Sequence, residues 1–308
     1  MSASTYRMAA VRTPAGPESV EIIDVPVVEP GPGEVRLQVA AAAVNPVDVA
    51  VVEGVFHAMG LVHQPHHVGL GWDVAGTVVA AGPGVELDPG TRVAGVVTGF
   101  DRDTGPFAEQ LVLPASNVAI VPDDLDLVAA ATVPLNALAA AQAVDLLGDA
   151  PAGRDRLLVT GAAGAVGGNA LVLAQDRGWR VTGLARAQDE PFVRGLGAGF
   201  TTRADAGWDA VVDAAALRDE ALALVRDGGT YVGVRPANPP VAERGIRIAT
   251  VETTPDRDRL APLLARAAHG ELPARVHAVV PLDHLGDALR AVAKGGVRGR
   301  YVVVPSVG

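Results

Sequence analysis

The chain has 308 residues, 49% of them hydrophobic, which suits two domains with sizeable cores. It has no cysteine and a formal net charge of −10 without a basic block. These features exclude disulfides, thiolate nucleophiles and cysteine-ligated zinc, and they argue against nucleic-acid or membrane partners. No apolar run is long enough to span a bilayer and residues 1–7 hold no signal-peptide core, so we expect a cytoplasmic protein.

The first third of the chain predicts a β-rich domain. Short apolar runs alternate with Pro/Gly turns, a pattern typical of a compact, partly open barrel. We expect strands at residues 6–12, 20–25, 34–44, 74–81, 92–97 and 108–113.

A histidine-rich segment interrupts these strands between residues 47 and 71. It contains His57, His63, His66 and His67, and the spacing of His63 and His66 is one that metal ligands use. Because cysteine is absent and acids are few nearby, we interpret this segment as a polar loop near the active cleft and expect no metal site.

Beyond residue 123, predicted strands and helices alternate, which indicates a doubly wound parallel sheet of the Rossmann type. The expected strands are residues 157–159, 180–184, 210–213, 230–234 and 246–250, and the helices are 125–132, 135–147, 169–176, 190–196, 217–226 and 257–269. A final strand–helix–strand pattern over 276–304 is expected to rejoin the first domain. The predicted domains are therefore 1–122 with 272–308, and 123–271.

A glycine turn, Gly161-x-x-Gly164-x-x-Gly167, joins the first of these strands to its helix. A bare triplet is also compatible with an ordinary tight turn. Its position between strand and helix, followed by another strand, favours a dinucleotide fingerprint that presents main-chain N–H groups to a pyrophosphate. The predicted cofactor-binding residues of this turn are Gly161, Ala163, Gly164, Ala165, Val166 and Gly167, of which Gly164 to Gly167 are expected to contact the pyrophosphate.

The end of the next strand distinguishes the two nicotinamide cofactors. An NAD site would place an acid there, yet the sequence reads Leu184-Ala185-Arg186 with no acid before Asp189. A guanidinium at Arg186 can bind a 2′-phosphate, so we predict NADPH, with Arg203 as a second contact. The alternative is that Arg186 is simply a solvated arginine. Gly233 and Val234, at the end of a later strand, are expected to border the nicotinamide.

Several motifs together resemble the medium-chain dehydrogenase/reductase superfamily, in particular its zinc-free quinone oxidoreductase (zeta-crystallin-like) branch. They occur in the family's order over essentially the whole chain. The motifs are Ala41-x-x-Val44-Asn45-Pro46-x-Asp48, Gly71-Trp72-Asp73-x-Ala75-Gly76, Gly90-x-Arg92-Val93-x-Gly95, Gly105-x-Phe107-Ala108-Glu109, the glycine turn, and Gly299-Arg300-x-Val302.

This resemblance implies a GroES-like catalytic domain and a Rossmann domain, with the nicotinamide in the cleft between them. It also implies metal-free reduction of a quinone or conjugated enone by NADPH, often in a homodimer. Zinc-dependent members carry an early cysteine and a histidine where Trp72 stands. This chain also departs from relatives that carry Tyr at Ala50 or Phe56 and Thr at Ala139, so two hydroxyl groups are missing.

Three residues are candidates for the chemistry. The Asn45 amide is expected to donate to the acceptor oxygen or hold the nicotinamide ribose, although it also suits a satisfied turn position. Asp48 is expected to orient its loop or act as a structural acceptor, and His57 is a candidate proton donor, with solvent as the alternative. Other functions that the sequence allows are an enoyl reductase of a biosynthetic pathway, a low-turnover NADPH-binding protein, and a metal-dependent alcohol dehydrogenase.

Overall fold

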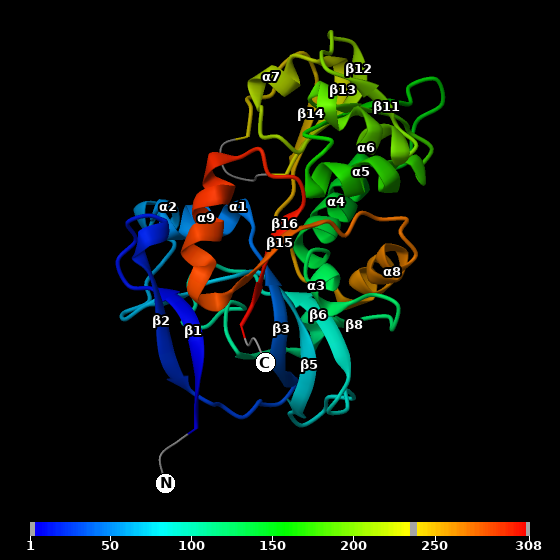
Figure 1. The fold of residues 1–308 in the computed structure, drawn as a ribbon. Helices are drawn as coiled ribbons and strands as arrows, with labels where there is room; N and C mark the ends of the chain where they lie inside the picture. The colour runs from blue at the N-terminus through cyan, green and yellow to red at the C-terminus, as the bar shows by residue number, and fades with distance from the viewer. Residues whose placement is uncertain (1–3, 235–238, 306–308) are drawn as a thin grey trace. The chain divides into compact units, whose positions relative to one another are not determined.

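The computed structural model describes residues 4–234 and 239–305, and the chain divides into two compact units (Figure 1). Unit 1 comprises Met1–Leu135, Pro255–Ala268 and Ala274–Gly308, and unit 2 comprises Asn136–Thr254 and His269–Pro273. This grouping differs from the expected boundaries, because residues 123–135 and the helix after residue 255 join unit 1. The contacts explain the difference: Arg92 donates to the Asp123 carbonyl oxygen at 3.3 Å, and helix α8 (Arg257–Ala268) packs beside strand β8 (Val118–Ile120).

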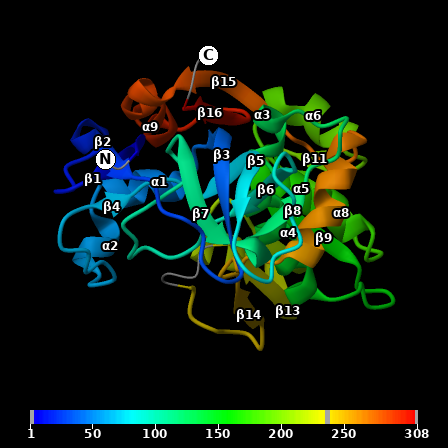
Figure 2. The ribbon, with the colours of Figure 1, turned by 90° about the horizontal axis from the view of Figure 1, so that it is seen from below.

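Unit 1 is built on two sheets. An antiparallel three-stranded sheet has the order β2-β1-β4, and a seven-stranded sheet has the order β15-β16-β3-β5-β6-β8, with β7 also paired to β3 (Figure 2). Alternate residues of β3 are buried, as in a strand with one face on the core. The strands are β1 (Thr5–Val11), β2 (Val20–Pro26), β3 (Glu34–Ala43), β4 (Val68–Gly69), β5 (Asp73–Ala81), β6 (Arg92–Val96), β7 (Gln110–Pro114), β8 (Val118–Ile120), β15 (Val276–Pro281) and β16 (Arg300–Val304).

The helices of unit 1 include two that the sequence analysis did not predict. These are α1 (Pro46–Val52) and α2 (Val55–Ala58), in the segment that we interpreted as a loop. Helix α1 packs against α9 in a core that contains Val49, Val52, Leu285 and Leu289. The remaining helices are α3 (Leu127–Ala130), α8 (Arg257–Ala268) and α9 (Leu285–Lys294).

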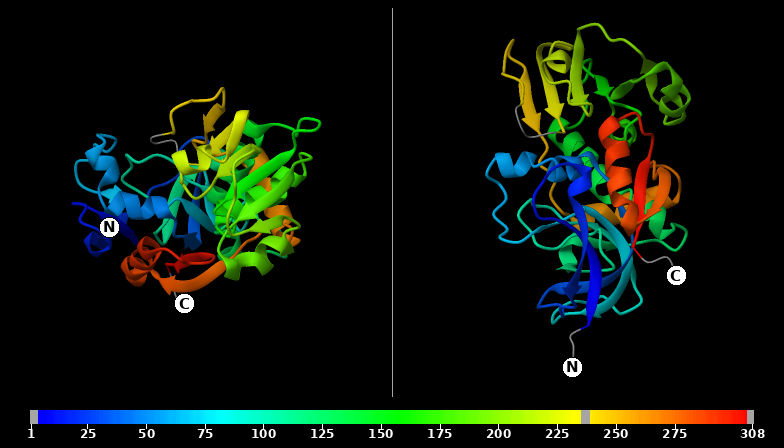
Figure 3. Two further views of the ribbon diagram at one scale, coloured as in Figure 1. Left: turned by 90° about the horizontal axis from the view of Figure 1, so that it is seen from above. Right: turned by 60° about the vertical axis from the view of Figure 1, so that its left-hand side comes forward.

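Unit 2 holds a six-stranded, all-parallel sheet in the order β11-β10-β9-β12-β13-β14. Its strands are among the green to yellow ribbons of Figure 3. Its strands are β9 (Arg156–Thr160), β10 (Arg180–Leu184), β11 (Gly199–Thr201), β12 (Trp208–Asp213), β13 (Val225–Gly233) and β14 (Arg247–Thr250), and its helices are α4 (Pro134–Leu147), α5 (Ala165–Gln175), α6 (Glu190–Gly195) and α7 (Asp219–Leu222). Alanines of α4 and α5 pack with valines of the sheet, so small side chains bring helix and sheet close.

The predicted class, a GroES-like barrel domain with a Rossmann sheet, is confirmed. Two helices are shorter than expected. The helix expected over residues 125–132 is only α3, and the helix expected over 217–226 is only α7, because β13 already begins at Val225. The short strands β4, β8 and β11 were not predicted. Within the described residues, no helix is both long and apolar enough to cross a membrane.

Candidate functional site

The glycine turn of unit 2 forms a cradle that only glycine permits. Gly161 follows β9 with φ of +59°, and a Cβ there would lie 3.1 Å from the Ala214 carbonyl carbon. A Cβ on Gly167 would overlap the carbonyl oxygen of Gly161, and one on Gly164 would lie 3.1 Å from that oxygen. Gly161 and Gly167 therefore leave no room for a side chain, and Gly164, at the start of α5, is exposed to solvent.

Helix α5 begins directly from this turn. Gly164 is its N-cap residue, so the N–H groups of Ala165, Val166 and Gly167 stand in the first turn, where a helix has no internal acceptors for them. Such N–H groups and the positive end of the helix dipole suit a diphosphate. The predicted pyrophosphate contacts thus lie together, and the open cradle fits a dinucleotide.

A buried carboxylate that the sequence analysis missed ties three strand ends together. Asp213, the last residue of β12, is 1% exposed and accepts hydrogen bonds from Thr160 Oγ1 at 2.6 Å and Tyr231 Oη at 2.9 Å. It also accepts from the main-chain N–H groups of Leu217 at 3.1 Å and Arg218 at 2.8 Å. Burial, together with the Asp213 carboxylate, raises the pKa of Tyr231 above its ordinary value. In the sequence, the only sign of this network is an acidic residue, Asp213, at the end of a predicted buried strand.

The loop held by Asp213 contains unusual backbone conformations. Ala216 and Arg218 have backbone φ angles of 57° and 55°, values that residues other than glycine rarely adopt. Such conformations persist only where surrounding contacts enforce them, and they cluster at functional sites. Here the two hydrogen bonds from the loop to Asp213 enforce them, beside the glycine turn.

Arg186 and Arg203 leave neighbouring strands at this same edge. Leu184 of β10 pairs with Thr160 on one side and Thr201 on the other, and each arginine stands two residues beyond its strand. Both side chains are exposed, and neither guanidinium has a hydrogen bond or ion pair among the described residues. Gly233 and Val234 end β13 at this edge too, where Val234 N–H donates to the Asp213 carbonyl oxygen at 3.3 Å.

Unit 1 holds a second polar site, buried around the start of α1. Asn45 is the N-cap of this helix, and its Nδ2 donates to Asp73 Oδ2 at 2.8 Å and to the Ala43 carbonyl oxygen at 3.2 Å. The main-chain N–H of Asn45 donates to Asp48 Oδ2 at 2.7 Å, and that of Leu135 to Asp73 Oδ1 at 2.6 Å. Burial raises the pKa of Asp48 and of Asp73 to about 7 each.

These contacts change the role expected for Asn45. Both hydrogens of its amide are donated to Asp73 and Ala43, so none is left for an acceptor oxygen. In this structure the Asn45 amide joins Asp73 to the Ala43 carbonyl oxygen, and the Asp48 carboxyl accepts from the N-cap N–H of α1. His57 lies half-buried on α2, and its Nδ1 has no hydrogen-bond partner within the described residues.

Two other histidines of the histidine-rich segment, His63 and His67, connect it to a neighbouring surface loop. His63 Nδ1 lies 3.2 Å from Asp101 Oδ2, and His67 Nε2 lies 3.1 Å from the Asp103 carbonyl oxygen. Over residues 4–234 and 239–305, no group of three or more His, Asp or Glu residues is arranged to hold a metal ion.

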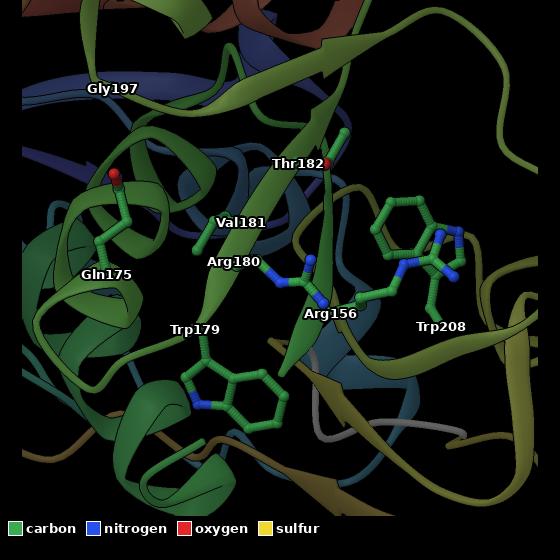
Figure 4. Close-up of a pocket in the computed structure, with 8 residues that line it drawn as sticks. All are labelled: Arg156, Gln175, Trp179, Arg180, Val181, Thr182, Gly197 and Trp208. Atoms are coloured by element: carbon green, nitrogen blue, oxygen red, sulfur yellow. The ribbon is translucent and has the colours of Figure 1, made fainter. Parts of the chain in front are cut away.

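A surface cavity of about 510 Å³ lies at the other end of the parallel sheet (Figure 4). It opens beside Arg156, Arg180 and Trp208, the first residues of β9, β10 and β12, and the Arg156 guanidinium stacks 4.6 Å from the centre of the Trp208 ring. Because the glycine turn follows the carboxyl ends of the strands, this cavity is separate from the candidate nucleotide site.

Comparisons with known proteins agree with the two-unit fold. Residues 31–123 match the alcohol dehydrogenase GroES-like domain, and residues 186–303 match the zinc-binding dehydrogenase domain. The trans-enoyl reductase thnE of Trichoderma harzianum is 30% identical over 266 residues, covering 75% of this chain and 70% of thnE. The quinone oxidoreductase from Coxiella burnetii superposes with a TM-score of 0.86 at 22% identity, over 98% of this chain and all of that one.

The chain belongs to the medium-chain dehydrogenase/reductase superfamily. Within it, the chain lies in the zinc-free quinone oxidoreductase branch. The superfamily consists of oxidoreductases that use a nicotinamide cofactor, and the chain spans at most about half the length of the first curated relatives that it matches. It is 31% identical over 188 residues to the chloroplastic quinone-oxidoreductase homologue of Spinacia oleracea, covering 59% of this chain and 56% of that protein. It is 33% identical over 233 residues to the pikromycin polyketide synthase component PikAII of Streptomyces venezuelae, which is 70% of this chain but 6% of the synthase.

Proposed function

We propose that this medium-chain reductase uses NADPH to reduce a quinone or a conjugated enone without a metal ion. The observation that carries the proposal is the pair of unpaired guanidinium groups, Arg186 and Arg203, which leave adjacent strands beside the glycine cradle. A bound NADPH would supply the hydride. The chain's own part is to hold the pyrophosphate at Gly164–Gly167 and the 2′-phosphate at the two arginines.

The preference for the phosphorylated cofactor follows from charge. A guanidinium makes two parallel hydrogen bonds to a phosphate, and no carboxylate stands at the end of β10 to repel it or to bind a free 2′-hydroxyl. Gly233 and Val234 would border the nicotinamide from the end of β13. Asn45 and Asp48 would shape the acceptor side through the start of α1.

Titration of NADPH and NADH against two variants and one control tests this proposal. We expect Arg186→Ala to weaken NADPH binding by about 10- to 100-fold and Arg203→Ala by less, with little change for NADH. Arg180→Ala is the matched control, because Arg180 stands at the opposite end of β10 and pairs with Asp155 at 2.6 Å. A preference for NADH that Arg186→Ala leaves unchanged would contradict the proposal.

A second candidate reaction is reduction of an enoyl intermediate in a biosynthetic pathway. The similarity to the trans-enoyl reductase and to the polyketide synthase component favours it. NADPH oxidation with quinones, simple enones and enoyl thioesters, followed by absorbance at several concentrations, separates the two reactions. Tight NADPH binding without turnover on any acceptor would instead identify a binding protein, and loss of turnover with a chelator would identify a metal enzyme.

A further inference from the structure

Three neighbouring side chains near Gly71 in unit 1 each hold a buried polar atom that has no hydrogen-bond partner among the described residues. These atoms are Arg102 Nη1, Trp72 Nε1 and Asp48 Oδ1. Arg102 donates through Nη2 to the Gly71 carbonyl oxygen, and its positive charge acts on the buried Asp48 carboxyl. Trp72 is the next residue in the chain, and its ring centre lies 5.6 Å from Arg102 Cζ. None of these three atoms is used by the fold or by the functional proposal above.

Folded proteins satisfy the great majority of buried polar atoms, so three in one place indicate a missing partner. Two of the three are donors, and one of these belongs to a charged group. Burial lowers the pKa of Arg102 only to about 10, so it is cationic at neutral pH. The partner that suits two such donors is an oxygen that accepts hydrogen bonds and carries negative charge.

An apolar wall of aromatic rings lies beside these donors. Phe56 on α2 stacks on Phe100 with ring centres 3.8 Å apart, and Phe100 lies 5.5 Å from the Trp72 ring. The same segment exposes Val55 (41%) and Met59 (53%) to solvent. A planar, unsaturated ring matches this wall, since offset aromatic contacts favour flat partners.

We propose that Trp72 Nε1 and Arg102 Nη1 bind the carbonyl oxygen of the acceptor, whose unsaturated carbon skeleton lies against Phe56 and Phe100. This inference rests on the proposed reduction of a quinone or enone and names the groups that hold its oxygen. Negative charge develops on that oxygen when the acceptor is reduced, and donors already in place stabilise it. Trp72 and Arg102 thus supply donors in a chain that lacks the relatives' hydroxyls at Ala50, Phe56 and Ala139.

The indole N–H signals of ¹⁵N-labelled protein report this hydrogen bond directly. The chain has three tryptophans, and the other two indoles already donate: Trp179 to the Gly148 carbonyl oxygen at 2.9 Å and Trp208 to that of Asp205 at 3.0 Å. With NADP⁺ bound, so that no hydride is available, we expect cyclohex-2-enone to move the Trp72 signal downfield and leave the others in place. Cyclohexene, which lacks the oxygen, is expected not to move it.

Variants add a second measurement. Trp72→Phe keeps the ring and removes only the N–H, so we expect it to raise the KM or lower the kcat for enones by about three- to tenfold. Arg102→Met should cost about 10- to 100-fold, and Arg102→Lys less. Trp208→Phe is the matched control and should leave both constants unchanged. NADP⁺ affinity is measured for each variant, and we expect it to be unchanged.

The outcomes are distinct. A Trp72 signal that stays still up to saturating cyclohex-2-enone, with NADP⁺ bound normally, overturns this inference alone and indicates that a buried water occupies the place. Full activity of Trp72→Phe and Arg102→Lys would overturn it equally. Failure of NADP⁺ and NADPH to bind would instead refute the proposed function.

Discussion

The carboxyl edge of the parallel sheet and the buried cluster around Gly71 are both polar, but they are built differently. At the sheet edge, main-chain groups and glycines form the cradle, and the central carboxylate of Asp213 is fully hydrogen-bonded. In the cluster, side chains from distant segments meet, and three of their polar atoms have no partner. The first region is satisfied by its own chain, whereas the second leaves two donors, Trp72 Nε1 and Arg102 Nη1, for the acceptor oxygen that we propose.

The largest effect is expected from closing the cradle. Gly167→Ala places a Cβ against the Gly161 carbonyl oxygen, so we expect the free energy of unfolding to fall by about 3 kcal/mol. NADPH binding should weaken on the order of 100-fold, because the bend that presents the N–H groups must shift. Urea unfolding and NADPH titration measure the two effects.

Gly195→Ala serves as the control for this change. Gly195 lies at the end of α6 in the same unit, and a Cβ there meets nothing within 4 Å. We expect this variant to match the wild type or to be slightly more stable. If Gly167→Ala and Gly195→Ala had the same stability and the same NADPH affinity, the turn would tolerate a side chain at residue 167. The sheet edge would then not be the tightly constrained region that we describe.

A smaller loss of folding stability is expected from weakening the hydrogen bonds that the Asp213 carboxylate accepts. Asp213→Asn keeps one acceptor oxygen for four donors, so we expect a loss of about 2 kcal/mol in the free energy of unfolding. Tyr231→Phe removes a single donor and should cost about 1 kcal/mol. If the strained loop depends on Asp213, Asp213→Asn should also weaken NADPH binding, while Tyr231→Phe should not. Equal binding by both variants would contradict that link.

The sequence predicted the sheet edge well because its signals are local. Apolar strands, a glycine triplet and Arg186 stand next to one another in the chain, and strand register brings Arg203 and Gly233 to the same edge. The strands and helices of the alternating half were placed to within a few residues, apart from the region of α7 and the short strand β11, which was not predicted. In the region of α7, Val225 starts a strand although the preceding residues suit a helix.

The buried cluster was predicted only in part, because its contacts join residues far apart in sequence. Asn45 and Asp48 were singled out, but nothing local shows that the Asn45 amide binds Asp73 or that Arg102 reaches Gly71. Helix α1 was missed as well, since Val47, Val49, Val51 and Val52 favour a strand by propensity. Its cap, Asn45 with Pro46 next and Asp48 three residues on, was the available signal.

The smallest expected effect is a pH dependence of the free energy of unfolding, which arises from the buried cluster and not from the sheet edge. Asp48 has a pKa of about 7 in the folded protein, well above that of an exposed carboxyl, so unfolding releases its proton between about pH 4 and 7. Its contribution to stability is present at low pH and is lost as the pH rises through 7. We expect it to lower the free energy of unfolding by about 1 kcal/mol between pH 6 and 8.

Asp48→Asn tests this dependence, because the amide oxygen can still accept from the Asn45 N–H while the titrating group is gone. Urea unfolding at pH 6, 7 and 8 should show a shallower decline for the variant than for the wild type. The remaining decline includes Asp73, whose pKa is also raised to about 7 by burial. Asp155→Asn is the control: Arg180 lowers the pKa of that carboxyl, so its loss should leave the slope between pH 6 and 8 unchanged. If Asp48→Asn left the slope of unfolding free energy against pH unchanged, burial of the Asp48 carboxyl in the cluster would carry no cost in stability. The two regions would then differ only in how far apart their residues lie in the sequence.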